Sequence, residues 1–322
     1  MSMSLKNPSP KVSIVIPVYN GSNFLANSID CALRQTYENF EVIVVNDGST
    51  DGGETEKIAL SYGDRIRYFR KENGGVSSAL NYGIAQMTGE YFSWLSHDDA
   101  YTPHKLADAV KALCSAEGAD ERTLVYSWGN YIDSRGEVLK PWPLFLETGK
   151  LYTGDEMVQI MLTKRILNGC GLLIPKVVFD EVGGFHEGLR YSQDALIFYQ
   201  IFLKGFSMIF DGKENVSYRL HGAQTSRNRH DLFEHDMVEI AKILEPELAK
   251  RSSRDNNLLY LYAHKLSRFK CAAVIKLMKD SGDKHCKFTL RQKLTLQMGL
   301  FYGNFRGSVK KLYYRFVLRL KH

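Results

Sequence analysis

VSIVIPVYN (12–20) and FEVIVVNDGSTDGG (40–53) are the two stretches that decide the fold of this chain. Each begins with a run of β-branched residues, which predicts a strand, and each ends in the polar and glycine residues that are typical of a turn. The amphipathic segment 22–35 between them predicts a helix. A strand, a turn, a helix and a second strand in this order indicate βα units that build a largely parallel sheet.

The same alternation continues along most of the chain. Further strands are expected at 65–70, 90–95, 123–128, 170–175, 207–210 and 215–220, and further helices at 53–62, 76–87, 153–165 and after Ser192. Residues 129–151 are rich in Gly, Pro and aromatics and predict a loop or a lone hairpin. From about Asp231 the pattern is helical. We therefore expect an α/β domain over 1–228 and a helical extension over 229–322.

The composition points to a folded protein in a reducing compartment. Hydrophobic residues make up 44% of the 322 residues, which is enough to build a core. An odd number of cysteines without a CxxC pair argues against a disulfide framework and against a zinc site. The cysteines are Cys31, Cys114, Cys170, Cys271 and Cys286. Neither a signal peptide nor a membrane-spanning apolar run is visible, so we expect a cytoplasmic protein.

Two turns follow the first two predicted strands. In PVYN (17–20), Pro17 would end the strand, Tyr19 could lie against a flat base and Asn20 could bind polar atoms, although an ordinary strand-end turn would look the same. In NDGSTDGG (46–53), Asp47 could accept hydrogen bonds from a base or a ribose, and Gly48 would allow close approach. Asp51 is better explained as the cap of the next helix.

A third turn, NGGVSSALN (73–81), runs into a predicted helix whose free amides suit an anion or a sugar hydroxyl. Asn73, Ser77 and Asn81 are its candidate binding residues. The segment is neither GxGxxG nor a Walker A loop, which argues against a dinucleotide-dependent oxidoreductase and against an ATPase.

The fourth turn, WLSHDDAYTP (94–103), places Asp98 and Asp99 at the end of an apolar strand. Hard cations such as Mg²⁺ and Mn²⁺ bind carboxylate oxygens, so these residues are candidate metal ligands. The alternative is that one of them caps the helix expected near Thr102. His97 is a candidate binding residue that could equally be an outward-facing turn residue.

Two later segments supply further candidates. In GGFHEGLRYSQDALIF (183–198), Asp194 near a helix start is either a cap or a general base for a sugar hydroxyl. In YRLHGAQTS (218–226), Arg219 could bind a phosphate and His221 could bind a metal or a diphosphate. His221 could also be a surface or satisfied core residue.

In this order, the motifs resemble those of the inverting family 2 glycosyltransferases with a GT-A fold, of the type that builds bacterial surface polysaccharides. The resemblance covers roughly residues 12–226. It implies a nucleotide half at about 10–128, an acceptor half at about 150–228, and a nucleotide-diphosphate sugar, most simply a UDP-sugar, as donor. It also implies that Asp47 contacts uracil or ribose, that Asp98 binds Mn²⁺ or Mg²⁺, and that Asp194 activates the acceptor hydroxyl.

The sequence departs from the family pattern at two positions. Ser96 stands where the metal motif usually has its first Asp, which puts one ligand in doubt, and Gln193 stands where Glu commonly precedes the base. A non-catalytic module that binds nucleotide sugars or glycans is therefore one alternative. A nucleotidyltransferase, which would release pyrophosphate, is another.

The formal net charge of +6 arises in the tail, because residues 287–322 hold nine Lys or Arg and no Asp or Glu, which leaves the first 286 residues at −3. Apolar residues of 308–322 fall on one helical stripe, as in a helix that lies on anionic lipid or packs on its own domain. The segment 305–322 is thus a candidate peripheral contact with the inner face of the cytoplasmic membrane, and the acceptor could be lipid-linked. No nucleic-acid-binding motif accompanies the charge, and the sequence does not indicate an oligomeric state.

Overall fold

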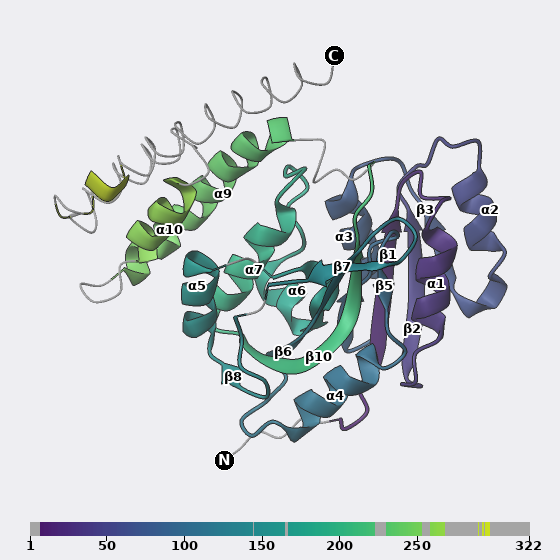
Figure 1. The fold of residues 1–322 in the computed structure, drawn as a ribbon, viewed down its shortest axis with the longest axis horizontal. Helices are drawn as coiled ribbons and strands as arrows, with labels where there is room; N and C mark the ends of the chain where they lie inside the picture. Colours follow the sequence, from purple (N-terminus) through teal and green to yellow (C-terminus); the bar gives the residue numbers. More distant parts are fainter. Residues whose placement is uncertain are drawn as a thin grey trace. The chain divides into compact units, whose positions relative to one another are not determined.

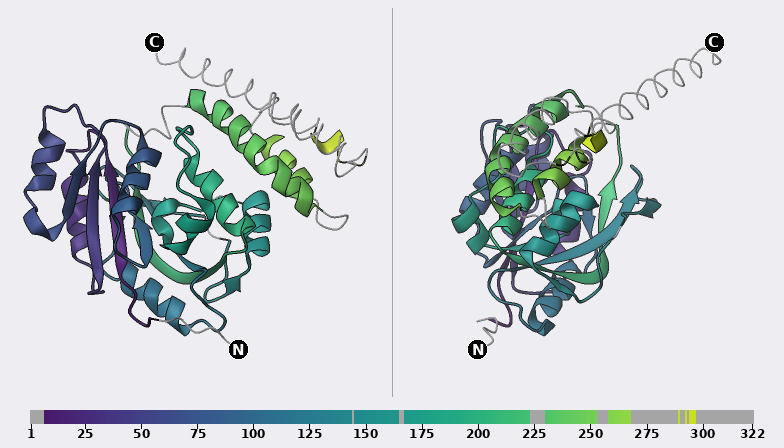
Figure 2. Two further views of the ribbon diagram at one scale, coloured as in Figure 1. Left: turned by 180° about the vertical axis from the view of Figure 1, so that it is seen from behind. Right: turned by 90° about the vertical axis from the view of Figure 1, so that its left-hand side faces the viewer.

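A computed structural model describes residues 7–143, 145–164, 167–222, 230–252, 258–267, 289, 292 and 294–296 (Figures 1 and 2). The chain divides into two compact units. One comprises Met1–Val158 and Ile166–Arg229, and the other comprises Gln159–Arg165 and His230–His322. The predicted tail segment 305–322 lies outside the described residues.

The first unit begins with four parallel strands in the order β3-β2-β1-β4. The strands are β1 (Val12–Val18), β2 (Phe40–Asn46), β3 (Arg67–Arg70) and β4 (Tyr91–Trp94), and the helices between them are α1 (Leu25–Leu33), α2 (Glu54–Leu60) and α3 (Val76–Gln86). This alternation confirms the predicted βα units, and both helices and strands begin and end within a few residues of the predicted limits. Pro17 does not end β1, because it still pairs with Val45 and the strand continues to Val18.

The next strand, β9 (Leu172–Pro175), runs antiparallel to both of its neighbours. The sheet is therefore mixed, but the expectation of a largely parallel sheet is confirmed, because β6 (Thr123–Ile132) and β10 (Ser207–Arg219) run in the same direction as the first four strands. β9 is antiparallel because the chain returns to the sheet beside the carboxyl end of β4, where the Ser96 amide lies 3.5 Å from the Cys170 sulfur. A strand that starts at this edge has to run in the opposite direction to β4.

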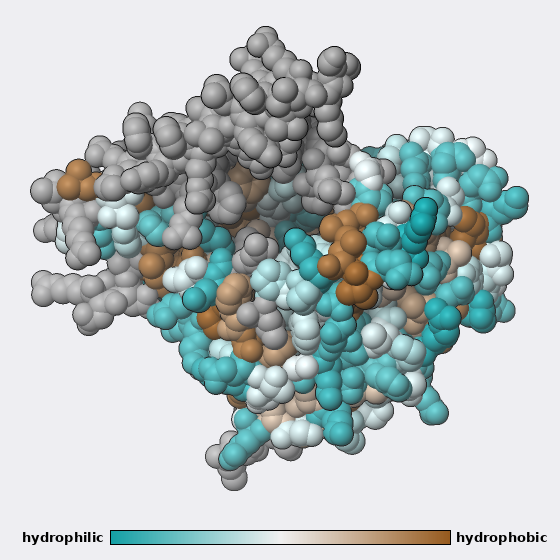
Figure 3. All heavy atoms as spheres, in the orientation of Figure 1, coloured by the Kyte–Doolittle hydropathy of each residue, from teal (hydrophilic) through white to brown (hydrophobic). Residues whose placement is uncertain are grey.

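The second half of the sheet combines two long strands, β6 and β10, with three short ones. It contains β5 (Ala100–Tyr101), β6 (Thr123–Ile132), β7 (Val138–Pro141), β8 (Leu151–Tyr152) and β10 (Ser207–Arg219). β10 lies parallel to β6, and register shifts between Phe210 and Val216 explain why the sequence shows it as two separate segments. β6 and β7 form the predicted lone hairpin. β7 is exposed throughout, and Figure 3 shows a brown hydrophobic patch where Figure 1 labels β7.

Helices pack on this sheet through apolar faces. α3 packs on β1 and β2, and α4 (Lys105–Ser115) packs on β6 and β10. The unit also contains α6 (Val177–Val182), α7 (Gln193–Leu203), the short turns η1 (Gly63–Arg65) and η2 (Gly169–Gly171), and the first half of α5 (Gly154–Thr163), whose residues from Gln159 belong to the second unit. Nearly all of α7 is buried, so its first turn is held firmly in place.

The second unit contains α9 (His230–Arg251) and α10 (Leu258–Ser267), which pack against each other. Ile240, Leu244 and Leu248 are buried at a spacing of four residues, as expected for the apolar stripe of a helix. The predicted helical character is confirmed for these residues. Among the described helices, none combines the length and apolar composition that crossing a bilayer requires.

Candidate functional site

The predicted turns meet at the carboxyl ends of the parallel strands. The PVYN turn is joined to the NDGST turn by two hydrogen bonds, from the Asn20 amide to the Ser49 hydroxyl (2.9 Å) and from the Thr50 amide to Asn20 Oδ1 (2.7 Å). Asn20 adopts a positive φ of 49°, which asparagine tolerates better than most residues. Tyr19 is 45% exposed, so its ring is open to a ligand.

Asp47 fixes the third turn to the end of β2. Its carboxylate is 3% exposed and accepts hydrogen bonds from the amides of Gly74 (3.0 Å) and Gly75 (2.7 Å), and it pairs with Lys71 Nζ (2.9 Å). Asn73 Nδ2 donates to the Asp47 carbonyl (2.9 Å). The structure thus brings Asp47 and Asn73 together, and it adds Lys71, which the sequence motifs did not single out.

Gly48, in the turn after β2, lies against the turn that contains Lys71 and Asn73. It has a φ of 71°, and a Cβ added there would lie 2.7 Å from the Asn73 amide nitrogen and 3.1 Å from the Lys71 carbonyl oxygen. Asp51, by contrast, has the local role expected from the sequence, because its Oδ2 accepts from the Thr55 amide (3.0 Å) in α2.

The first turns of α3 lie beside the segment that precedes Asp194. Asn81 exchanges two hydrogen bonds with the main chain of Phe185, from Nδ2 to the carbonyl (2.9 Å) and from the Phe185 amide to Oδ1 (2.7 Å). Arg190 Nη1 donates to the Gly74 carbonyl (2.8 Å). Asn81 therefore holds the two segments together. The Ser77 hydroxyl is buried and has no hydrogen-bond partner among the described residues.

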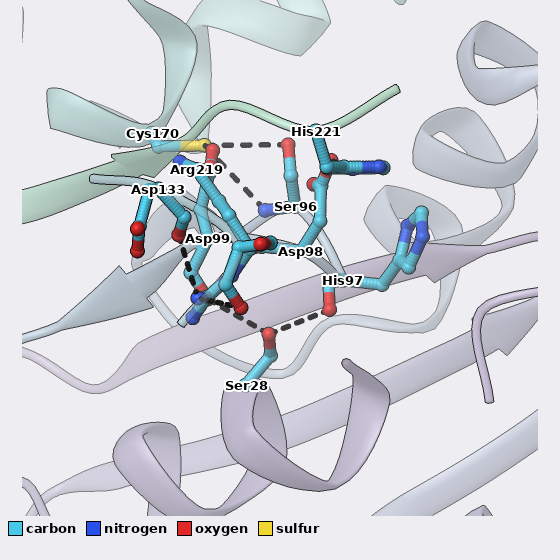
Figure 4. Close-up of polar contacts among 10 residues, drawn as sticks. Ser28, Ser96, His97, Asp98, Asp99, Asp133, Cys170, Arg219 and His221 are labelled. Carbon is cyan, nitrogen blue, oxygen red and sulfur yellow. Dashed lines mark hydrogen bonds and ion pairs between the residues drawn. The ribbon is translucent and has the colours of Figure 1, made fainter. Parts of the chain in front are cut away.

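Asp98 and His221 lie close together although they are 123 positions apart in the sequence. His221 Nε2 lies 2.9 Å from Asp98 Oδ2, and both side chains keep slight exposure, 12% for His221 and 13% for Asp98 (Figure 4). The Phe24 ring packs against the imidazole at a centroid distance of 5.0 Å. The pair is therefore held in place but remains open to solvent. The His97 ring turns away from the acidic cluster in Figure 4, and burial lowers its pKa.

Asp99 is buried and does not cap a helix. Its Oδ1 accepts from the Arg219 amide (2.9 Å), and its Oδ2 lies 3.3 Å from the Cys170 sulfur, which donates to it. Burial, with the charge of Asp98 adding to the effect, raises the pKa of Asp99. The capping alternative fails because α4 begins at Lys105, beyond the reach of this turn. Asp99 instead fixes the end of β10 against the end of β4.

Ser96, which stands where the family pattern has an acid, also contacts Cys170. Its hydroxyl lies 3.4 Å from the Cys170 sulfur. The sequence indicated only that Cys170 is not part of a disulfide framework or a zinc site, because nothing in the spacing along the chain shows that η2 returns to the end of β4. The buried thiol connects Ser96 to Asp99.

Arg219 is only 6% exposed, and its guanidinium lies among main-chain oxygens. Nε donates to the Asp98 carbonyl (2.8 Å), and Nη1 donates to the carbonyls of Asp133 (3.2 Å) and Ser134 (3.3 Å) (Figure 4). Nη2 donates to Asn27 Oδ1 (3.3 Å). These contacts connect the turn that carries Asp98 to the turn of the β6–β7 hairpin. The sequence did not predict this role for Arg219.

Asp194 lies in the first turn of α7. Burial raises the pKa of its carboxyl to about 6, although a hydrogen bond from the Ala195 amide to Oδ1 (2.8 Å) acts in the opposite direction. The side chain keeps partial exposure. A carboxylate with a pKa near this value is ionised at neutral pH and still basic enough to accept a proton.

The polar groups fit a divalent cation only in part. Among the described residues no group of three or more His, Cys, Asp or Glu could hold a metal ion by itself. Asp98 and His221 are two ligands that lie close together. Mg²⁺ is commonly held by one or two protein ligands together with substrate phosphates and water. The pair therefore suits a cation that arrives with, or is completed by, a diphosphate.

Comparisons with known proteins identify the family of this chain. The model of glycosyl transferase family 2 matches residues 13–183. A glycosyltransferase of Rickettsia felis is 48% identical over 221 residues, which are 68% of this chain and 35% of that protein. Chondroitin synthase of Pasteurella multocida is 28% identical over 94% of this chain and 30% of its own length. This chain therefore spans about a third of the length of both relatives.

A solved structure is similar over most of the chain. The crystal structure of S. aureus TarS in complex with UDP-GlcNAc superposes with a TM-score of 0.64 at 18% identity and covers 91% of this chain and 80% of that one. At this level of identity the likeness shows the fold.

Proposed function

The chain belongs to glycosyl transferase family 2 and has the GT-A fold, and we propose that it moves a sugar from a UDP-sugar to a glycan or lipid-linked acceptor with inversion at the anomeric carbon. The observation that carries this proposal is the contact of Asp98 with His221 at the carboxyl end of β4. Membership of the family makes the protein a glycosyltransferase, which favours sugar transfer over nucleotidyl transfer and over binding alone.

The nucleoside binds at the turns after β1 and β2. The exposed ring of Tyr19 offers a flat surface for a base, with Pro17 and Asn20 fixing the turn that carries it. Asp47 and Lys71 supply a hydrogen-bond acceptor and donors beside Gly48 and Asn73. The similarity to TarS, which was solved with UDP-GlcNAc, supports a uridine nucleotide as donor.

Ser77 and Asn81 serve the donor side in different ways. No described residue bonds the buried Ser77 hydroxyl in the first turn of α3, and we assign it to a hydroxyl or phosphate oxygen of the donor. Asn81 is occupied by Phe185 and acts by holding the segment that leads to Asp194. His97 borders this region through its contact with Gly21.

Asp98 and His221 would hold Mn²⁺ or Mg²⁺ together with the diphosphate of the donor. A cation bound there supplies positive charge that stabilises the departing nucleoside diphosphate. Asp99 does not share this role, because its carboxylate is bonded to the Arg219 amide and to Cys170. Arg219 contributes indirectly, because its guanidinium donates a hydrogen bond to the Asp98 carbonyl and so fixes the turn that carries Asp98.

Asp194 accepts the proton of the acceptor hydroxyl while that oxygen attacks the anomeric carbon. An inverting displacement needs one such base and no enzyme nucleophile. Burial raises the pKa of Asp194 to about 6, which keeps a carboxylate available at neutral pH and strengthens it as a base.

The proposal also assigns a role to each part of the chain and a place for the protein in the cell. Residues 1–228 form the catalytic domain, with 10–128 serving the donor and 150–228 the acceptor, and 229–322 form the helical extension. The protein works at the cytoplasmic face of the membrane, where the basic segment 305–322 contacts anionic lipid. The domain assignments rest on the order of the sequence motifs and their resemblance to the family, and the membrane contact rests on the basic charge of the tail.

A product-detecting screen tests the proposed function. Purified protein is incubated with UDP-, GDP- and dTDP-sugars, with Mn²⁺ and a panel of glycoside acceptors, and the released nucleotide is identified. We expect UDP and a glycosylated product from at least one UDP-sugar, with loss of turnover on addition of EDTA. Release of pyrophosphate, or UDP binding without turnover across the whole panel, would contradict sugar transfer.

A further inference from the structure

The hairpin of β6 and β7 carries a group of aromatic rings that the proposed donor site does not use. Trp142 follows β7, and its ring centre lies 5.0 Å from that of Tyr131 and 5.2 Å from that of Tyr218. Tyr131 and Trp142 are half-buried, whereas Tyr218 is buried. The three rings form an aromatic platform whose inner end is covered and whose outer end reaches the surface.

The main chain fixes the platform. The Trp142 amide donates to the Gly129 carbonyl (2.8 Å), and the register pairs Tyr131 with both Lys140 of β7 and Tyr218 of β10. A ring that packs on two others and extends from a hydrogen-bonded strand loses little freedom when a ligand binds it. The platform is therefore arranged for binding in advance.

Arg219 links this aromatic platform to the turn that carries Asp98. It follows Tyr218 in β10, and its guanidinium donates to the carbonyls of Asp133 and Ser134 in the hairpin turn and to the carbonyl of Asp98. Burial raises the pKa of Tyr218 well above its usual value, and Cys170 and Asp99 lie close enough to add to that shift. Tyr218, the buried end of the platform, thus lies beside Cys170 and Asp99, close to the turn that carries Asp98.

The surface around the platform is mixed in character. Lys140 Nζ lies 5.4 Å from the ring centre of Tyr131, and Asn130 donates a hydrogen bond to Glu214 on the paired strand. Val138 and Leu139 of β7 are 64% and 53% exposed, and Figure 3 shows a hydrophobic patch bordered by hydrophilic surface where Figure 1 labels β7. The half-buried rings of Tyr131 and Trp142 thus have a charged group and an amide beside them.

This chemistry fits a sugar better than a lipid surface or a second protein chain. A pyranose ring presents C–H groups on one face and hydroxyls around its edge, so it matches an aromatic surface with a polar rim. A lipid surface would require a continuous apolar area, whereas here Glu137 and Lys140 flank the two apolar residues of β7.

We infer that Trp142, supported by Tyr131 and Tyr218, is the platform on which a pyranose ring of the acceptor glycan stacks. The inference rests on the proposed function, because it places an acceptor beside the donor site. It assigns the hairpin to recognition of the acceptor and adds no step to the chemistry.

Direct binding tests this inference without relying on turnover. Full-length protein saturated with UDP and Mn²⁺ is titrated with methyl β-glycosides of glucose, galactose, N-acetylglucosamine and N-acetylgalactosamine, and with cellobiose and chitobiose, by saturation-transfer NMR. We expect Trp142→Ala to weaken glycoside binding about tenfold, as loss of a stacked ring commonly does. Trp142→Phe, which keeps a ring and the packing, should weaken it about threefold.

Leu139→Ala is the matched control, since Leu139 is exposed on the same hairpin and lies outside the ring cluster. It should leave glycoside binding within twofold of the wild type. UDP affinity and the melting temperature, measured on each variant, report whether the hairpin and the donor site remain intact, and both should be preserved in Trp142→Phe.

Three outcomes would overturn the inference. They are unchanged glycoside binding in Trp142→Ala, an equal loss in Leu139→Ala, and no binding of any glycoside by the wild-type protein. None of these depends on consumption of a donor sugar, whereas failure of the proposed function would appear as the absence of donor turnover in the screen. The two failures can therefore be told apart.

Discussion

The Nε2 atom of His221 lies 2.9 Å from Oδ2 of Asp98, although the two residues are 123 positions apart in the sequence. Asp98 lies in the turn between β4 and β5, and His221 lies two residues beyond the end of β10. β5 pairs with the end of β10, and this pairing brings together one carboxylate and one imidazole, which are both ligands of Mn²⁺.

Asp98→Asn and His221→Ala should each weaken Mn²⁺-dependent UDP binding at least tenfold, because each removes one of the two protein ligands of the proposed metal. Calorimetric titration with UDP, in Mn²⁺ and in EDTA, measures the effect. UDP affinity in EDTA should change much less. His235→Ala is the control, because His235 is 65% exposed in α9. Equal affinity of Asp98→Asn and the wild type in Mn²⁺ would exclude Asp98 as a ligand.

Asp194→Asn should lower kcat by a factor of about 10² to 10⁴, the usual contribution of a general base, with UDP affinity unchanged. Asp180→Asn, at an exposed position of α6, is the control for a change of charge in the same region. Normal turnover in Asp194→Asn would refute its assignment as the base.

The pH profile gives a second test of Asp194. The group acts as a carboxylate, so kcat/KM should rise with pH through the pKa of about 6 and level off above it. The rising limb should be absent from the residual activity of Asp194→Asn. A wild-type profile that is flat between pH 5 and pH 7, on the order of one unit either side of that pKa, would speak against this residue.

Gly48→Ala should weaken UDP binding and Gly52→Ala should not. Both glycines have positive φ values, 71° and 70°, so each substitution carries a similar backbone strain of about 1–2 kcal/mol. Only at Gly48 does the new Cβ meet other atoms, since it would lie 2.7 Å from the Asn73 amide, whereas nothing lies within 4 Å at Gly52. Calorimetry with UDP, together with thermal melting, separates the two effects. Equal losses of affinity would show that strain alone is responsible.

Lys105→Met should stabilise the protein near neutral pH. The Lys105 side chain is fully buried, with Nζ 2.9 Å from the Ser93 hydroxyl, and burial lowers its pKa to about 8. The folded state therefore disfavours the ammonium, and replacing it by an apolar side chain of similar size removes a penalty of about 3 kcal/mol. The free energy of unfolding in urea measures the difference.

The sign of the pH dependence follows from the lowered pKa of Lys105. The unfolded chain gains its proton near pH 10.5 and the folded protein near pH 8, so stability of the wild type falls as pH decreases between these values. The advantage of Lys105→Met should thus be greatest at and below pH 8 and vanish near pH 10.5. An advantage that is constant with pH would show that packing, and not charge, accounts for it.

The turns that carry the candidate residues could be read from the sequence because each is a local feature. NDGSTDGG and NGGVSSALN follow β-branched runs and precede helical patterns, and parallel strands bring their carboxyl ends to one edge. For the same reason the sequence indicated that Asp47 and Asp98 belong to one region, whereas only the resemblance to the family added Asp194 to them. Their roles in binding and catalysis stay predictions.

The partners of Asp99 and Arg219 could not be read in the same way. Asp99 resembles a helix cap in the sequence, yet its carboxylate bonds the amide of a residue 120 positions away. Arg219 resembles a phosphate ligand, yet its guanidinium holds carbonyls of the hairpin turn and of the Asp98 turn. Cys170 joins Ser96 to Asp99 only because β9 enters the sheet antiparallel to β4.

The sequence by itself determined the order of strands, turns and helices in the first half of the sheet and the family to which the chain belongs. Hydrophobic periodicity and turn residues act over a few neighbouring positions, so they are already present in the unfolded chain. The tertiary structure alone decided the direction of β9, the burial of Asp99 and Arg219, and the meeting of Trp142 with Tyr131 and Tyr218. These depend on which polar and aromatic groups are brought together when water is excluded, and no local pattern specifies that.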